Sequence, residues 1–126
     1  MFKPLQMASS SFKDPLSKDW SEKLVTSYNH RLSPYEQERF VVAPAAGLLT
    51  NLKDLELLLS VEINKETLLS KANYDKMRDS DAMGYGLGHM VNKLDQEVLF
   101  IGHTGLGMGW NASFNLHRIP GMALSF

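Results

Sequence analysis

The sequence predicts an α+β fold in which an antiparallel β-meander packs against helices. Residues 83–126 contain four segments with the two-residue alternation of strands, separated by short turns. Residues 48–72 before them carry leucines at helical spacing. Strands joined by short turns pair with their neighbours in the chain, and helices grouped ahead of them pack on the resulting sheet. We therefore treat residues 1–126 as one domain, with residues 1–47 mostly in loops.

The composition is that of an ordinary globular domain, with 44% hydrophobic residues, 21% charged residues and a net charge of −1. This balance argues against intrinsic disorder, and the absence of a basic patch argues against nucleic acid or an anionic membrane as partner. No apolar run is long enough for a membrane segment. Cysteine is absent, so a disulfide or thiolate metal site is excluded. The four histidines lack the i, i+4 spacing of paired zinc ligands, so we expect no metal and no cofactor.

Residues 1–43 predict mostly irregular structure, because prolines, serines and charges interrupt any long period. Ser33-Pro34-Tyr35-Glu36 has the form of a capping box and predicts at most a short helical turn. Ser10-Ser11-Phe12-Lys13 matches the catalytic pattern Ser-x-x-Lys. We reject it as a nucleophile, since Asp14-Pro15 would end the helix that aligns such a serine with its lysine. For Tyr28 we expect packing under a loop instead of catalysis.

Leucines 52, 55 and 59 predict an amphipathic helix over about residues 51–60, with its leucines in the core. Thr50 is the predicted N-cap, and Asp54 falls near the positive end of the helix dipole. A second helix is predicted from Asn64, burying Leu68, Leu69 and Ala72. Residues 73–82, with three aspartates and two basic residues, predict a solvated loop.

The first strand is predicted near Met83, followed by a hairpin turn at residues 92–96. Its glycines would share a face that another element approaches closely, and His89 is expected to be a satisfied or exposed histidine. In the second strand, one face would carry Val98, Phe100 and Gly102. The other face would carry Leu99, Ile101 and His103. The third would bury Trp110, Ala112, Phe114 and Leu116. A type II turn at Pro120-Gly121 would lead to a fourth strand at residues 122–126.

Between the second and third strands, residues 101–110 combine His103 and Thr104 with four glycines. Histidine is readily charged or neutral near neutral pH. Glycine is used where φ is positive or where a ligand approaches the backbone. A simple hairpin of two to five turn residues needs no such pair, so the stretch indicates either a functional site or a glycine-rich hairpin connection.

His103-Thr104-Gly105 resembles the Lys/His-Thr-Gly motif of the serine β-lactamase and penicillin-binding-protein superfamily, in its branch of class C β-lactamases, D-alanyl-D-alanine carboxypeptidases, D-aminopeptidases and esterases. Three further blocks resemble the family in the family's order. Phe2-Lys3-Pro4-Leu5-Gln6-Met7 is similar to F-x-P-L-G-M. Residues 44–50 with Asp54-Leu55 are similar to P-A-G-G-L-x-S/T followed by D-L. Tyr85-Gly86-Leu87-Gly88 is similar to Y-G-L-G.

The resemblance implies an incomplete β-lactamase/transpeptidase-like fold, because the family's Ser-x-x-Lys and Tyr-x-Asn elements precede the F-x-P-L-G-M block. The chain would then be the C-terminal fragment of a serine hydrolase, inactive alone. Its complete parent would hydrolyse an ester or amide (a β-lactam, a D-amino peptide or an ester) through an acyl-serine intermediate. The alternative is a non-catalytic fragment or interaction partner that completes a split hydrolase with an N-terminal fragment. Open sheet edges would also permit self-association.

The same resemblance assigns roles to four residues. His103 would supply positive or hydrogen-bonding character toward the carboxylate of a small-molecule or peptide substrate, and Thr104 would bond the same carboxylate. Gly105 would leave room for substrate, and the backbone N–H of Leu106 would be one of two oxyanion donors. One such preorganised donor contributes about 3 kcal/mol of transition-state stabilisation. Histidine in place of lysine points toward carboxypeptidase, aminopeptidase or esterase members.

Overall fold

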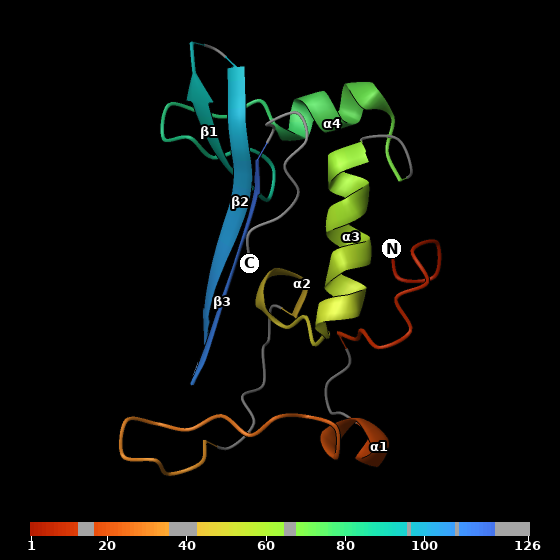
Figure 1. Ribbon diagram of the computed structural model, residues 1–126, viewed down its shortest axis with the longest axis vertical. Coiled ribbons are helices and arrows are strands. Elements are labelled where there is room, and N and C mark those ends of the chain that lie inside the picture. Colours follow the sequence, from red (N-terminus) through yellow and green to blue (C-terminus); the bar gives the residue numbers. More distant parts are fainter. Residues whose placement is uncertain (13–16, 36–42, 65–67, 96, 108, 118–126) are drawn as a thin grey trace.

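The computed structural model describes residues 1–12, 17–35, 43–64, 68–95, 97–107 and 109–117. It has the predicted α+β architecture, with an antiparallel sheet beside an upright helix (Figure 1). The helices are α1 (Lys18–Ser21), α2 (Ala43–Ala46), α3 (Leu52–Asn64) and α4 (Lys71–Met77). The strands are β1 (Met90–Leu94), β2 (Glu97–Gly107) and β3 (Trp110–His117). The predicted turn at Pro120-Gly121 and the fourth strand lie outside the described residues.

Helix α3 begins at Leu52, one residue later than its predicted start. The Asn51 side-chain oxygen accepts the Asp54 N–H at 2.8 Å, so Asn51 is the N-cap and the assignment of Thr50 is wrong. The Thr50 hydroxyl instead lies 2.8 Å from Ser10 Oγ. The helix also continues past the expected end, to Asn64, because its last turns pack on both sides.

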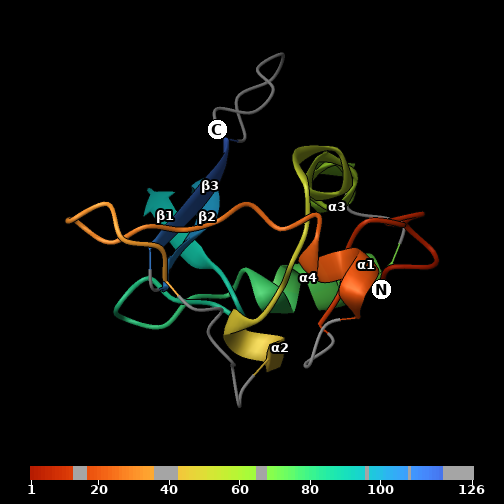
Figure 2. The same ribbon diagram turned by 90° about the horizontal axis from the view of Figure 1, so that it is seen from below.

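Two apolar clusters make α3 the centre of the fold. Toward the sheet, Leu59 packs with Val91, Ile101 and Leu116. On another side of the helix, Val61 of α3 packs with Leu5 and Met7 of the N-terminal segment and with Tyr74 of α4. Figures 1 and 2 show the resulting order, with the sheet on one side of α3 and residues 1–12 on the other. Leu52 belongs to neither cluster and is 73% exposed, so its predicted place in the core is wrong.

The second helix differs from its prediction. The sequence predicts that it begins at Asn64, yet α4 covers Lys71–Met77 and is capped by Ser70. Its buried residue is Tyr74, only 1% exposed, whereas Leu69 and Ala72 are exposed and Leu68 is partly buried. The predicted solvated loop over residues 73–82 is therefore wrong in its first half. A prediction from the spacing of leucines could not place α4, because the residue that α4 buries is a single tyrosine.

The first strand is shorter than predicted and begins at Met90. Gly84 and Gly88 have φ of 78° and 79°, the left-handed region, so the chain before Met90 turns instead of extending. The predicted close approach is confirmed at Gly86, where an added Cβ would collide with the Met77 carbonyl oxygen at the end of α4. His89 is buried, and its Nδ1 lies 3.3 Å from the Leu87 carbonyl oxygen.

A β-bulge changes which residues of β2 share a face. In the pairing of β1 with β2, Asn92 is opposite Phe100 and Lys93 is opposite Val98, so Leu99 is left without a partner. The extra residue reverses the alternation, and Val98 joins Ile101 on the core face. The prediction that these two residues lie on opposite faces is wrong. In β3, Leu116 is buried and Phe114 packs on the same cluster as predicted, but Trp110 is 49% exposed.

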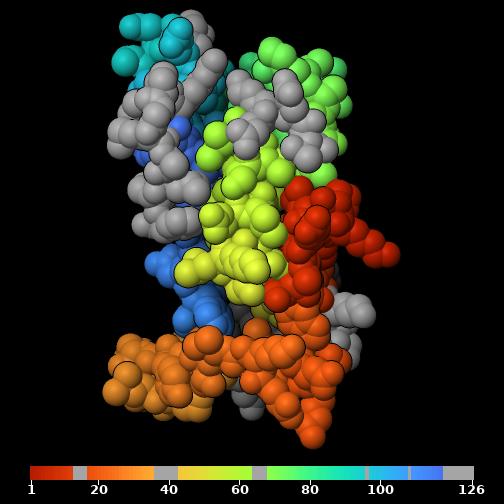
Figure 3. Space-filling model, turned by 45° about the vertical axis from the view of Figure 1, so that its right-hand side comes forward, coloured from red at the N-terminus to blue at the C-terminus, as the bar shows by residue number. Residues whose placement is uncertain are grey.

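The segment between α1 and Tyr35 lies across the base of the molecule, below the β2–β3 hairpin (Figure 3). Tyr28 pairs with Pro34 in an isolated bridge, and its ring is 54% exposed, so packing under a loop is wrong. The described part of residues 1–43 is otherwise mostly irregular, as predicted, with one short helix. No helix among the described residues is long and apolar enough to cross a membrane.

Candidate active site

The predicted site residues His103, Thr104, Gly105 and Leu106 lie inside β2, not in the turn that follows it. Strand β3 pairs with β2 along this whole stretch, from Phe100 to Gly107. Strand β1 pairs with β2 only as far as Gly102, which is opposite Met90. Within the described residues, β2 from His103 to Gly107 therefore has one edge without a strand partner.

The hydrogen bonds of Val91 show which edge of β2 the backbone N–H and C=O groups of each residue face. Its N–H donates to the Gly84 carbonyl at 2.7 Å, outside the ladder, so Val91 and Ile101 do not exchange hydrogen bonds. In an antiparallel ladder the direction alternates along a strand. Ile101 and His103 consequently direct their backbone groups toward β3. Thr104 and Leu106 direct theirs to the open edge, where a ligand can reach them.

The side chains along this stretch leave the edge accessible. Leu106 is 87% exposed, and a Cβ added to Gly105 would find only the Ala112 Cβ, at 4.0 Å. Gly102, by contrast, is buried, and a Cβ there would lie 2.5 Å from the Phe114 carbonyl oxygen. A methyl group at Gly105 would therefore be accommodated, whereas Gly102 is closely packed against β3.

His103 is half-buried, and its ring has a defined hydrogen-bonding state. Its Nδ1 lies 2.6 Å from the Thr104 carbonyl oxygen, which can only accept, so Nδ1 carries a hydrogen. Its Nε2 is hydrogen-bonded to the Tyr85 hydroxyl, and the two rings meet edge to face with centroids 5.8 Å apart. Neutral His103 thus accepts a hydrogen bond from the Tyr85 hydroxyl at Nε2. Residue Tyr85 belongs to the Y-G-L-G block, but the sequence indicated no role for it in the site.

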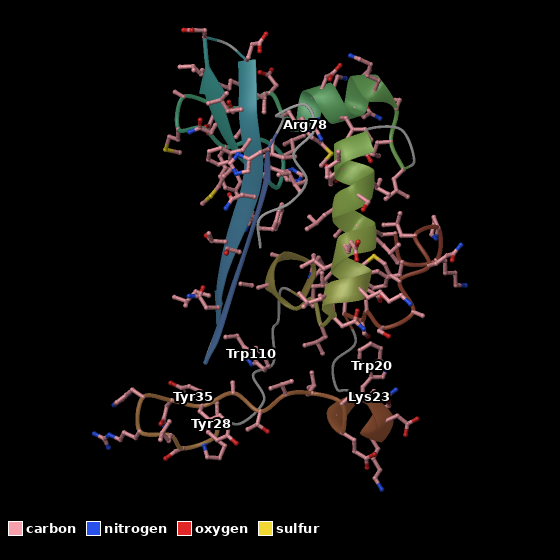
Figure 4. All side chains as sticks on the ribbon, viewed as in Figure 1. Trp20, Lys23, Tyr28, Tyr35, Arg78 and Trp110 are labelled. Atoms are coloured by element: carbon pink, nitrogen blue, oxygen red, sulfur yellow. The ribbon has the colours of Figure 1, made fainter. Side chains whose placement is uncertain are left out.

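A second cluster of ionisable groups lies between α3, α4 and the loop before β1, and it was missed because residues 73–82 were expected to be solvated. Glu62 Oε2 is 3.7 Å from Arg78 Nη2 and 3.9 Å from His89 Nε2. The Arg78 guanidinium also lies over the Tyr74 ring, 5.7 Å from its centroid. Burial, and then the Glu62 charge, raise the pKa of Tyr74 above 10.0. Figure 4 shows Arg78 at the α4 end, far from Trp110 at the hairpin.

A cavity of about 470 Å³ lies beside this second cluster, lined by Glu62, Arg78, Val98, Ile101 and Leu116 among others. None of the four predicted site residues lines it. Because its walls carry acidic, basic and apolar groups together, it has no single charge preference. No group of three or more histidines, aspartates and glutamates in the described ranges could hold a metal ion.

Ser10, the serine of the rejected Ser-x-x-Lys match, has a structural environment. Its hydroxyl donates to Asp54 Oδ2 at 2.8 Å, and the Ser9 N–H donates to the same oxygen at 2.7 Å. Ser10 is 8% exposed and lies outside any helix. These bonds tie the N-terminal segment to the first turn of α3. Lys13 lies outside the described residues.

No family model matches the sequence, and no curated protein matches it. Among solved structures, the fold is similar to that of an octameric penicillin-binding protein homologue from Pyrococcus abyssi, with a TM-score of 0.68. The two are 24% identical, and the match covers 93% of this chain and 29% of that protein. At this identity the likeness shows the fold alone, which is of the penicillin-binding-protein and β-lactamase type. The predicted resemblance is confirmed at that level.

Proposed function

We propose that residues 1–126 form the C-terminal portion of a β-lactamase-related serine hydrolase domain. The complete site would cleave an ester or amide of a small molecule or peptide through an acyl-serine intermediate. The observation that carries this proposal is the edge of β2 without a strand partner among the described residues. Leu106, three residues after His103, directs its backbone N–H to this edge. The likeness of fold to a penicillin-binding protein homologue supports the class of reaction.

In this mechanism the substrate lies along the open edge of β2. A serine oxygen attacks the carbonyl carbon, and its proton passes to the neighbouring general base. The carbonyl oxygen becomes an oxyanion and accepts the Leu106 N–H. The oxyanion then collapses, the leaving group departs with a proton, and water hydrolyses the acyl-serine. A fixed backbone donor suits this role because it needs no reorganisation as the charge develops.

His103 and Thr104 would bind the carboxylate or carbonyl at the far end of the substrate. The Thr104 side chain is exposed, and His103 can carry a positive charge. No cofactor takes part in this scheme. The Ser-x-x-Lys and Tyr-x-Asn elements would come from a longer parent or from a second chain, because Ser10 is engaged by Asp54 and Thr50.

The first test is covalent labelling of the purified chain with a fluorescent penicillin and with a fluorophosphonate, measured by intact mass. We expect no adduct on the chain alone. When an N-terminal segment with Ser-x-x-Lys and Tyr-x-Asn is supplied, we expect an adduct on its serine. An adduct on Ser10 would overturn the proposal, as would the absence of labelling in the complemented, folded complex.

A substitution at Leu106 then tests the oxyanion donor. Leu106→Pro removes an N–H that does not belong to the β2–β3 ladder, and proline is tolerated at such edge positions. In the complemented complex it should slow acylation by about 100-fold. Leu106→Ala is the matched control, because it removes the same side chain and keeps the N–H. Equal acylation rates for the two variants would exclude this donor.

A second function, that of an interaction partner, is favoured by apolar side chains exposed on the sheet. Leu94 is 59% exposed and Leu99 is 42% exposed. Within the described residues β3 has one edge without a strand partner, and the outer edge of β1 is bridged only near its start, between Met90 and Tyr85. The similar Pyrococcus abyssi protein is octameric. We propose self-association, or pairing with an N-terminal fragment, through these edges. Light scattering after size exclusion should then show oligomers, and a monomer at every concentration without any partner would contradict it.

A further inference from the structure

Tyr85 is held in place by a compact loop. The Asp81 carboxylate accepts the N–H groups of Met83 and Tyr85 at 2.9 and 3.0 Å. The Asp81 N–H in turn donates to the Tyr85 carbonyl at 3.0 Å, and Tyr85 forms a bridge with Met90 at the start of β1. The backbone of Tyr85 is therefore fixed from both sides. Tyr85 is 40% exposed and its contact with His103 lies at the surface, so the hydroxyl remains within reach of a ligand.

The proton of the Tyr85 hydroxyl depends on the state of His103. Since Nδ1–H donates to the Thr104 carbonyl, neutral His103 has an unprotonated Nε2, which accepts a hydrogen bond from the Tyr85 hydroxyl. The tyrosine oxygen then offers only lone pairs to a ligand. When His103 gains a proton at Nε2, that new N–H donates to the tyrosine oxygen. The hydroxyl hydrogen is released from the ring and can turn outward, beside a positive imidazolium.

We propose that Tyr85 is a positioning and specificity-determining residue, which offers its hydroxyl hydrogen to an anionic group of the ligand only when His103 is protonated. This inference rests on the proposed function, and it adds a charge preference to the same site. A carboxylate is bound by a donor and a positive charge together in the protonated state. In the neutral state it would meet the lone pairs of the tyrosine oxygen. An uncharged amide can donate to that oxygen, so its binding does not require the protonated state.

Among the residues that the structure describes, few other ionisable groups face His103. The loop before β1 contributes Tyr85 and, next to the Phe114 ring, the buried His89. His89 is directed to Glu62 of α3, which also lies near Arg78. The Asp81 carboxylate faces the backbone of its own loop. The residues that pair with this part of β2 are Met90 of β1 and, in β3, residues 110–114, none of which is ionisable.

The state of the ring is tested first, by nitrogen NMR of the imidazoles of the full chain, with His103→Gln used to assign the signals. At pH 8 we expect neutral His103 in the Nδ1–H form. The Nε2–H form would overturn the inference, because the tyrosine oxygen would then accept in both states and protonation would release nothing.

Binding is tested next by NMR titration with two probes, N-acetyl-D-alanyl-D-alanine and its C-terminal amide. We expect the acid to bind about tenfold more tightly at pH 5.5 than at pH 8, and the amide to change little. Tyr85→Phe should reduce the pH dependence for the acid, leaving only the part that the charge of His103 supplies, and should leave the amide unaffected. Tyr28→Phe is the matched control, since it removes an exposed hydroxyl elsewhere in the chain.

The outcomes separate this inference from the proposed function. If the acid binds and Tyr85→Phe keeps the full pH dependence of the wild type, the role of Tyr85 is excluded while the carboxylate site stands. If neither probe binds at any pH, the carboxylate site itself fails, and the role of Tyr85 fails with it. If the amide shows the same pH dependence as the acid, the charge preference is refuted.

Discussion

Substitution of two glycines in β2 provides a sharp test of the packing around the site. Gly102 and Gly105 are three residues apart, and neither requires a positive φ. A Cβ added at Gly102 would lie 2.5 Å from the Phe114 carbonyl oxygen and 2.5 Å from the Asn115 side-chain oxygen. The Asn115 side chain can move aside, but the Phe114 carbonyl belongs to the backbone of β3. At Gly105 the nearest atom would be 4.0 Å away, an ordinary contact.

The expected costs follow from these distances. Gly102→Ala must push the Phe114 carbonyl outward, away from the His103 N–H that the ladder directs toward it. Overpacking of this kind costs about 1–3 kcal/mol. For a chain of this size each kcal/mol lowers the Tm by roughly 4 °C. Gly105→Ala should keep the wild-type stability or add up to about 1 kcal/mol, because alanine loses less entropy in a strand.

Urea unfolding followed by circular dichroism measures both variants against the wild type. We expect the unfolding midpoint of Gly102→Ala to fall with an unchanged slope, and that of Gly105→Ala to hold. If the proposed site is correct, the same Gly105→Ala protein should bind N-acetyl-D-alanyl-D-alanine more weakly, because the new methyl group would fill the space in which the substrate is proposed to lie. Equal stability of the two variants, or loss of stability at Gly105 alone, would refute the packing described for β2.

Three other predictions concern the framework. Leu59→Ala should cost about 2–5 kcal/mol in urea unfolding, because Leu59 is 1% exposed between α3 and the sheet, whereas Leu52→Ala, at a 73% exposed position, should cost under about 0.5 kcal/mol. Asn51→Ala should remove the cap of α3 and cost about 1 kcal/mol; no loss in thermal melts would argue against this cap. Because the pKa of Tyr74 is raised in the folded state, its contribution to the free energy of unfolding is complete below the ordinary tyrosine pKa of 10.0. This contribution is lost as the pH rises from there through the folded-state pKa, so stability should fall above about pH 10. Tyr74→Phe should remove that part of the decline, measured by urea unfolding against pH.

The proposed site shows where sequence reasoning succeeded and where it stopped. The Lys/His-Thr-Gly resemblance directed attention to residues 103–106, which the structure places together at an open strand edge. Their roles remain a proposal. The contact of Tyr85 with His103 joins two residues that are 18 positions apart. No local pattern encodes it, because it depends on a turn at Gly84 and on the bridge between Tyr85 and Met90.

Local sequence patterns predicted the α+β class, helix α3, the order of the strands and the burial of Leu59 and Leu116. These features follow from local periodicity, which is set by the geometry of one helix or one strand. The tertiary structure alone decided the place of α4, the bulge at Leu99 and the open edge of β2. Each depends on which surfaces meet: one buried tyrosine anchors α4, an unpaired residue shifts the β1 register, and β1 begins too late to cover His103. Contacts between distant segments decide these arrangements, and the spacing of hydrophobic residues within one segment cannot predict such contacts.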